Sequence, residues 1–169
     1  MKPSAIYVGL VAAILLQLFV LSGMVVKAAM PLWTGTEIRV KTVPVDPRSM
    51  FRGNYARLNY AFGLLPEDAF GDTEEVRLGE VVYVSLQPGE GGLYEYAGAS
   101  LTQPESGVFL RGRIVNAYAP YRVNYGIDAF FAPKKKALKL EQELRNGGMA
   151  VLMVTAGGRV ALKDVIANN

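Results

Sequence analysis

The residues most able to do chemistry lie between positions 45 and 60. Three arginines, Arg48, Arg52 and Arg57, follow a single nearby acid, Asp46. Guanidinium groups hold carboxylates and phosphates through paired hydrogen bonds. The segment therefore predicts either contact with an anionic ligand or partner, or an Arg–Asp bridge that organises the loop. The candidate binding or loop-organising residues are Asp46, Arg48, Arg52, Gly53, Asn54, Tyr55 and Tyr60.

The backbone of this segment is specified by its residue types. Pro44 and Pro47 fix their own φ angles and hold the preceding residues in extended conformations. Gly53 and Asn54 both tolerate the positive φ that tight turns use. We expect a loop of defined shape that leads into a tyrosine-bearing strand.

A serine–lysine hydrolase is the alternative enzyme hypothesis. Ser49 and Met50 form a pair that loosely resembles membrane-bound signal peptidases, and a buried lysine such as Lys163 would supply the base. No second motif accompanies the pair, so we expect Ser49 to be a turn hydroxyl. Ser49 is the single catalytic candidate, and a non-enzymatic protein is favoured.

The composition excludes several kinds of chemistry. The chain has no histidine and no cysteine, which removes imidazole bases, thiolates and disulfides. The remaining acids lack calcium-loop spacing, so we predict no metal and no cofactor. The net charge of +3 comes from 18 basic and 15 acidic residues, and Lys2 and Lys27 lie in the N-terminal segment. The rest of the chain has 16 basic and 15 acidic residues and is close to neutral, so nucleic acid is not an expected partner.

The N-terminal segment predicts a transmembrane helix. No charged residue occurs from Ala5 to Val26, and such a helix would span a hydrocarbon core of about 30 Å. A cleaved signal peptide is the alternative, because Val26-Lys27-Ala28 has small residues at cleavage spacing. The apolar run exceeds the usual signal core, so we favour an uncleaved anchor. We predict a single-pass protein of the inner (cytoplasmic) membrane, with its C-terminal domain in the periplasm or outside.

Small residues recur every fourth position along this helix and lead to an amide. Small side chains allow close helix approach, and an amide in lipid gains by finding a partner. This face predicts contact with an integral membrane protein, although a lipid-facing anchor with fortuitous small residues stays open. The ridge consists of Ala5, Gly9, Ala13 and Gln17.

The remainder alternates apolar and polar residues between turn signals, as antiparallel strands do. We predict a mainly β (α+β) protein: an anchor over 1–32, then a compact β-barrel or sandwich-like extracytoplasmic domain over 33–169 with one short helix. Pro31, Trp33 and Gly35 are expected to end the first helix. Strands are predicted over 37–43, 54–62, 81–87, 93–102, 108–117, 122–132, 149–155 and 159–165, with a loop over 63–80 and a helix over 133–145.

Three stretches resemble a family of bacterial membrane-anchored proteins named for the signature G-D-Y-x-x-L-x-Y. They are Gly53 to Tyr60, preceded by Val45-Asp46-Pro47-Arg48; Tyr125 to Pro133; and Gly158 to Lys163. The resemblance implies an anchored periplasmic domain whose genes often lie beside genes for polytopic membrane proteins of unknown function, with no activity assigned. Asn54 replaces the signature Asp, so no carboxylate mechanism carries over at that position.

Overall fold

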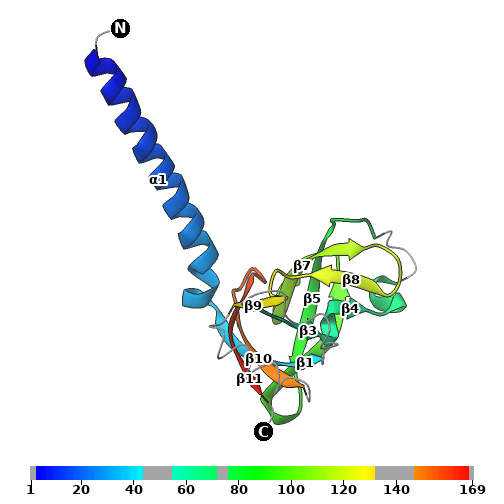
Figure 1. The fold of residues 1–169 in the computed structure, drawn as a ribbon. Coiled ribbons are helices and arrows are strands. Elements are labelled where there is room, and N and C mark those ends of the chain that lie inside the picture. The colour runs from blue at the N-terminus through cyan, green and yellow to red at the C-terminus, as the bar shows by residue number, and fades with distance from the viewer. Residues whose placement is uncertain (1–2, 44–54, 72–75, 132–146, 168–169) are drawn as a thin grey trace.

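The structure, a computed structural model, describes residues 3–43, 55–71, 76–131 and 147–167 of the 169-residue chain. One long helix projects from a head built of strands (Figure 1). The mainly β class with one N-terminal helix, predicted from the sequence, is confirmed. The predicted helix over 133–145 lies outside the described residues.

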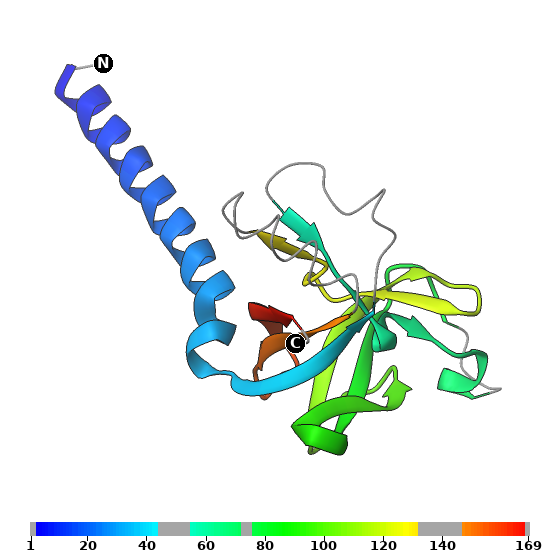
Figure 2. The same cartoon turned by 60° about the horizontal axis from the view of Figure 1, so that its bottom comes forward.

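Helix α1 runs from Pro3 to Thr34. It continues through Pro31, a residue that lacks an N–H donor, and ends just before Gly35, inside the predicted terminating segment. The Gly35 amide donates to the Pro31 carbonyl at 3.0 Å, and the Thr34 hydroxyl donates to the Met30 carbonyl at 3.0 Å. Every side chain from position 6 to position 28 is exposed, so the head covers only the last turns (Figure 2).

Among the described residues, nine strands form one open, mostly antiparallel sheet, whose order is β11-β10-β1-β6-β5-β7-β8-β4, with β3 paired to β1. Only β1 and β6 run parallel among the described pairs. A separate two-stranded sheet joins β2 to β9. The sheet strands are β1 Thr36–Val43, β3 Asn59–Tyr60, β4 Leu64–Leu65, β5 Val81–Pro88, β6 Leu93–Ser100, β7 Val108–Asn116, β8 Tyr121–Asn124, β10 Gly148–Val154 and β11 Val160–Ala167; the pair is β2 Tyr55–Arg57 and β9 Ala129–Phe131.

Two predicted strands are divided. The stretch 54–62 becomes β2 and β3, followed by a 3-10 turn over Ala61–Gly63. The stretch 122–132 becomes β8 and β9, because Tyr125 and Ile127 are buried with Gly126 at a φ of 76° between them. The predicted loop over 63–80 contains the short strand β4 and a 3-10 turn, Glu67–Phe70. A 3-10 turn at Glu90–Gly92 lies in the predicted Pro-Gly turn.

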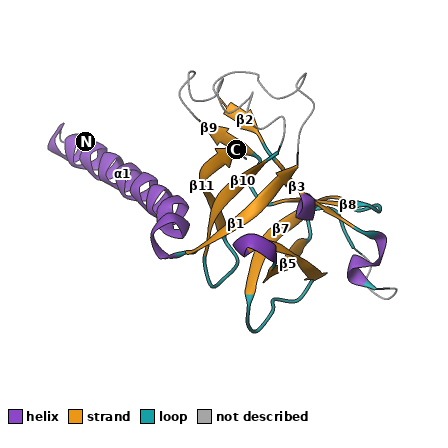
Figure 3. Ribbon diagram, turned by 90° about the horizontal axis from the view of Figure 1, so that it is seen from below, coloured by secondary structure: helices purple, strands orange, loops and turns teal. Residues whose placement is uncertain are grey.

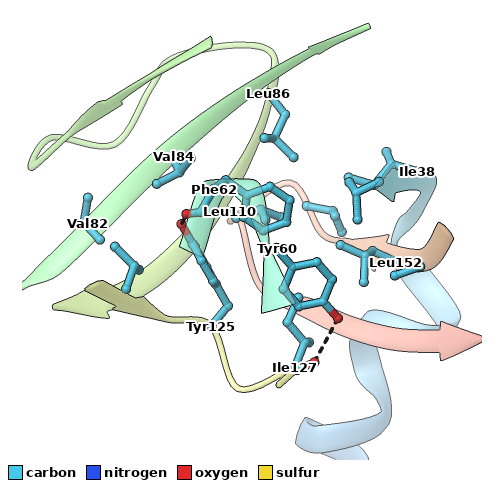
Figure 4. Close-up of a cluster of buried hydrophobic side chains, with 14 of the residues drawn as sticks. Ile38, Tyr60, Phe62, Val82, Val84, Leu86, Leu110, Tyr125, Ile127 and Leu152 are labelled. Carbon is cyan, nitrogen blue, oxygen red and sulfur yellow. Dashed lines mark hydrogen bonds between the residues drawn. The ribbon is translucent and has the colours of Figure 1, made fainter. Parts of the chain in front are cut away.

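The core is a cluster of buried side chains contributed mainly by β1, β5, β7 and β10, part of which Figure 4 shows. Alternate residues of the strands face it, as a period of two requires. Ile38 and Leu152 approach from β1 and β10, and Val84 approaches from β5 (Figure 4). Tyr60 and Phe62 fill the space between these strands. Each fully buried aliphatic side chain contributes about 1.5–3 kcal/mol before entropy is counted, so this layer holds the head together.

Candidate functional site

The structure brings the signature segment and the later Tyr-Gly segment into direct contact. Strand β2 pairs antiparallel with β9, with Tyr55 opposite Phe131 and Arg57 opposite Ala129. Beyond β2, the Leu58 amide donates to the Asp128 carbonyl at 2.8 Å. Two stretches about 70 residues apart in the sequence thus form one structural unit at the side of the main sheet (Figure 3).

Tyr60, the last tyrosine of the signature, is a buried residue. Its side chain is 5% exposed, and its hydroxyl donates to the Ile127 carbonyl at 2.9 Å (Figure 4). Its ring stacks on Phe62 with centroids 5.1 Å apart. Burial first, and then the Asp128 charge, raise the pKa of Tyr60 well above its ordinary value. The phenol therefore acts as a hydrogen-bond donor and is not a source of charge.

Tyr125 closes the same cluster from the opposite side. Its hydroxyl donates to the Phe62 carbonyl at 2.8 Å, and its ring meets the Phe62 ring edge-on at 5.4 Å. Burial raises the pKa of Tyr125 well above its ordinary value, and charges at Tyr96 and Asp128 add to this effect. Two tyrosines from different segments thus satisfy two buried carbonyls of the opposite segments, which fixes their relative position.

A pocket of about 170 Å³ opens beside this cluster. Its walls come from the end of β1, from the 58–64 segment and from β8 with the turn after it. Arg122 and Asp128 supply charged groups to the lining, Asn59 supplies an amide, and Val43 and Leu64 add exposed apolar surface. A lining with both charges beside apolar area suits recognition of a mixed polar and apolar group. Among the described residues, no group of three His, Cys, Asp or Glu side chains is placed to hold a metal ion.

The sequence-predicted site residues are described only in part. Asp46, Arg48, Ser49, Arg52, Gly53 and Asn54 lie outside the described residues. Tyr55 is placed by its backbone in β2, and Tyr60 is placed in full. Contact with an anion and an Arg–Asp bridge in this loop therefore both stay predictions.

Lys163, the lysine considered as a base for Ser49, lies on the surface. Its Nζ atom is 2.7 Å from a carboxylate oxygen of Glu37, and the two side chains are 52% and 41% exposed. A lysine that serves as a general base needs an apolar pocket to lose its proton near neutrality. Lys163 has no such surroundings, and nothing in its contacts favours the hydrolase hypothesis.

Of the helix ridge, Gly9, Ala13 and Gln17 are exposed. Ala5 lies in the first turns of α1. A Cβ atom added at Gly9 would meet nothing within 4 Å. The described part of the head leaves this ridge open along its length.

Five residues of the site were not among the site residues predicted from the sequence: Phe62, Arg122, Tyr125, Ile127 and Asp128. Phe62 follows the signature by two positions, and a hydrophobic residue there carries no special signal. Ile127 and Asp128 lie in the Tyr-Gly segment, whose likeness to the family could have marked them for attention. Arg122 lies on a predicted strand, and no sequence pattern around it indicates that it lines a pocket.

The described part of the chain is thus an apolar N-terminal helix followed by a β-rich head, in which the signature and Tyr-Gly segments pair as a second, two-stranded sheet. The chain belongs to the GDYXXLXY protein family, whose model matches residues 17–165. The function of this family is unknown. No curated protein and no solved structure matches the chain.

Proposed function

We propose that the protein is a membrane-anchored extracytoplasmic binding domain that acts with an integral membrane protein. The observation that carries the proposal is helix α1. Its stretch Ile6–Thr34 is 29 residues long, and its most apolar window has a mean hydropathy of 2.4, enough to cross a membrane or to serve as a signal sequence. None of its most apolar window is buried by the rest of the protein. An uncovered apolar surface of this size needs lipid or a partner.

An uncleaved anchor is favoured by the continuity of the helix. The candidate cleavage sequence, Val26-Lys27-Ala28, lies within α1, about two turns before its end at Thr34. A protease needs an extended substrate, so cutting there would first require local unwinding. The last turn is also tied to the head, because Pro31 is buried and Gly35 packs on the backbone of β10.

Within the membrane, we propose that the partner contacts the helix ridge formed by Ala5, Gly9, Ala13 and Gln17. Replacing Gly9 and Gln17 with leucine together removes both the close approach and the amide. Ser22→Leu is the matched control, because position 22 lies on the opposite side of the helix at 100° per residue. A photo-crosslinking residue at position 13 should give an adduct with a different protein, and the double variant should abolish it. An adduct unchanged by the double variant, or one of twice 18.3 kDa, would remove this partner contact.

The contact proposed on the head is the pocket lined by Asn59, Arg122 and Asp128. Its position beside the family signature supports this choice, since the signature residues build one of its walls. Arg122→Gln should weaken capture of the crosslinked partner. Arg77→Gln should leave capture unchanged, because Arg77 is an exposed arginine outside the pocket lining.

A further inference from the structure

A second recess lies where the anchor meets the head. Its volume is about 380 Å³, and it is open to solvent. The last turn of α1 supplies one wall through Met30, Pro31 and Thr34. The turn between β10 and β11 supplies the other through Thr155, Gly157 and Arg159. In Figures 1 and 2 this turn, coloured orange to red, lies beside the C-terminal end of α1.

The end of the recess nearest the membrane, at Met30 and Pro31, lies at the height of the phosphate layer of a bilayer. The uncharged run ends at Val26, and Lys27 is the first charge after it. Met30 and Thr34 lie about 5 to 10 Å beyond Lys27 along the axis, at 1.5 Å per residue. The polar layer on each face of a bilayer is about 5–7 Å thick. Exposed Trp33 also suits this interfacial depth.

The electrostatics of the recess favour an anion. Arg159 is exposed, and it makes no ion pair in the described part of the chain. Lys27 adds a second cation on the adjoining helix. The amides of Ala156 and Gly157 find no acceptor among the described residues, and both residues are exposed in the turn. Successive free amides of a turn beside a guanidinium form an anion-binding concavity.

The turn is held in place before any ligand arrives. The Gly158 amide donates to the Thr155 carbonyl at 2.9 Å, and the Arg111 amide of β7 donates to the Gly158 carbonyl at 2.7 Å. The Arg159 amide donates to the Thr155 hydroxyl at 3.1 Å. Gly158 has a φ of 75°, and a Cβ atom there would meet the Phe109 ring at 2.7 Å. A fixed turn binds with a smaller entropy cost than a loose one.

We propose that this recess binds the phosphate of a phospholipid head group in the leaflet from which the head emerges, with Arg159 as the principal cation. The acyl chains lie along the apolar helix below it. The bound lipid holds the head at a set angle to the membrane surface. The inference rests on the anchoring proposed above.

The test uses the full-length protein in a mild detergent and measures retained lipid by native mass spectrometry. Dioleoylphosphatidylglycerol should bind, and dioleoylglycerol, which has the same chains without the phosphate, should not. Arg159→Gln should weaken phosphatidylglycerol binding about tenfold, the scale of one lost charge-assisted hydrogen bond. Arg159→Lys should retain most of the binding, and the matched control Arg77→Gln should bind as the wild type does.

Three outcomes would overturn the site: equal binding of the two lipids, unchanged binding by a folded Arg159→Gln variant, or equally tight binding of glycerol phosphate. The two-lipid comparison and the glycerol phosphate competition need no variant, so a variant that fails to fold leaves the test decisive. If the Arg159→Gln variant stays in the membrane fraction and still binds phosphatidylglycerol as the wild type does, the proposed anchor stands and only this lipid site is ruled out.

Discussion

The hydroxyl of Tyr60 donates a hydrogen bond to the carbonyl oxygen of Ile127 at 2.9 Å, and this bond joins the family signature to the Tyr-Gly segment. Both residues are buried, with exposed fractions of 5% and 2%. The bond satisfies a carbonyl that would otherwise lie in the core without a donor. The pocket beside Tyr60 therefore depends on how these two segments are held together.

Replacing Tyr60 with phenylalanine tests this link directly. The ring stays stacked on Phe62, but the Ile127 carbonyl loses its donor. The free energy of unfolding should fall by about 1–2 kcal/mol, measured by denaturant unfolding of the full-length protein in detergent. Tyr118→Phe is the control, because Tyr118 is 82% exposed and its loss should change little. Equal stabilities of the Tyr60→Phe variant and the wild type would show that the bond contributes nothing.

The raised pKa values of Tyr60 and Tyr125 predict alkaline sensitivity. Both phenols stay neutral in the folded protein beyond the ordinary value of 10.0, whereas in the unfolded chain they ionise near it. Their contribution to stability is therefore complete below about pH 10 and is lost as the pH rises above it. The Tyr60→Phe/Tyr125→Phe variant should lose less stability than the wild type between pH 9 and pH 11. Parallel stability curves for the two proteins would contradict the assignment.

Gly35 is a position where a side chain should be costly. A Cβ atom there would lie 2.5 Å from the Pro31 carbonyl oxygen and 2.9 Å from the Val154 amide nitrogen. Because both neighbours are backbone, Gly35→Ala should lower the free energy of unfolding by about 1–3 kcal/mol. Gly98→Ala is the matched control, since a Cβ at Gly98 meets nothing within 4 Å. Thermal unfolding of the two variants side by side is the measurement. A Gly35→Ala variant as stable as the Gly98→Ala control would show that α1 and β10 are not closely packed at Gly35.

Lys163 should be dispensable for stability. Its ion pair with Glu37 is solvent-exposed on both sides, and the pKa of Glu37 is lowered, first by the hydrogen bond from Lys163 and then by its charge. Exposed pairs of this kind contribute little, so Lys163→Gln should change the free energy of unfolding by less than about 1 kcal/mol. Denaturant titration at pH 7 is the measurement. A large loss of stability would mean that the pair is more protected than its exposure indicates.

The strands could be predicted where apolar and polar residues alternate. Ile38 and Val40 mark β1 by this period, and Gly157-Gly158 marks the turn between β10 and β11. The breaks were not predictable from local pattern. Leu58 and Ile127 look like ordinary strand residues. In the structure, however, Leu58 lies between β2 and β3, and Ile127 lies between β8 and β9.

The pocket could not be predicted, because its two charged residues come from a segment that meets the signature only in the folded chain. Arg122 lines it from β8, and Asp128 follows in the turn beyond. The parallel pairing of Arg39 with Leu93 and of Val40 with Tyr94 likewise depends on tertiary arrangement and leaves no local trace. Family resemblance marked the right segments, and only the three-dimensional arrangement showed how they meet.

The topology of the anchored chain is the most direct test of the account. Because the chain has no cysteine, Ser106→Cys and Ser4→Cys each introduce a single thiol, one in an exposed turn of the head and one at the start of α1. In intact cells with a permeable outer envelope, a membrane-impermeant maleimide should label position 106 and not position 4, in protein that resists alkaline extraction from the membrane. Labelling of position 106 only after the inner membrane is broken, or release of the protein by alkaline extraction, would contradict the proposal.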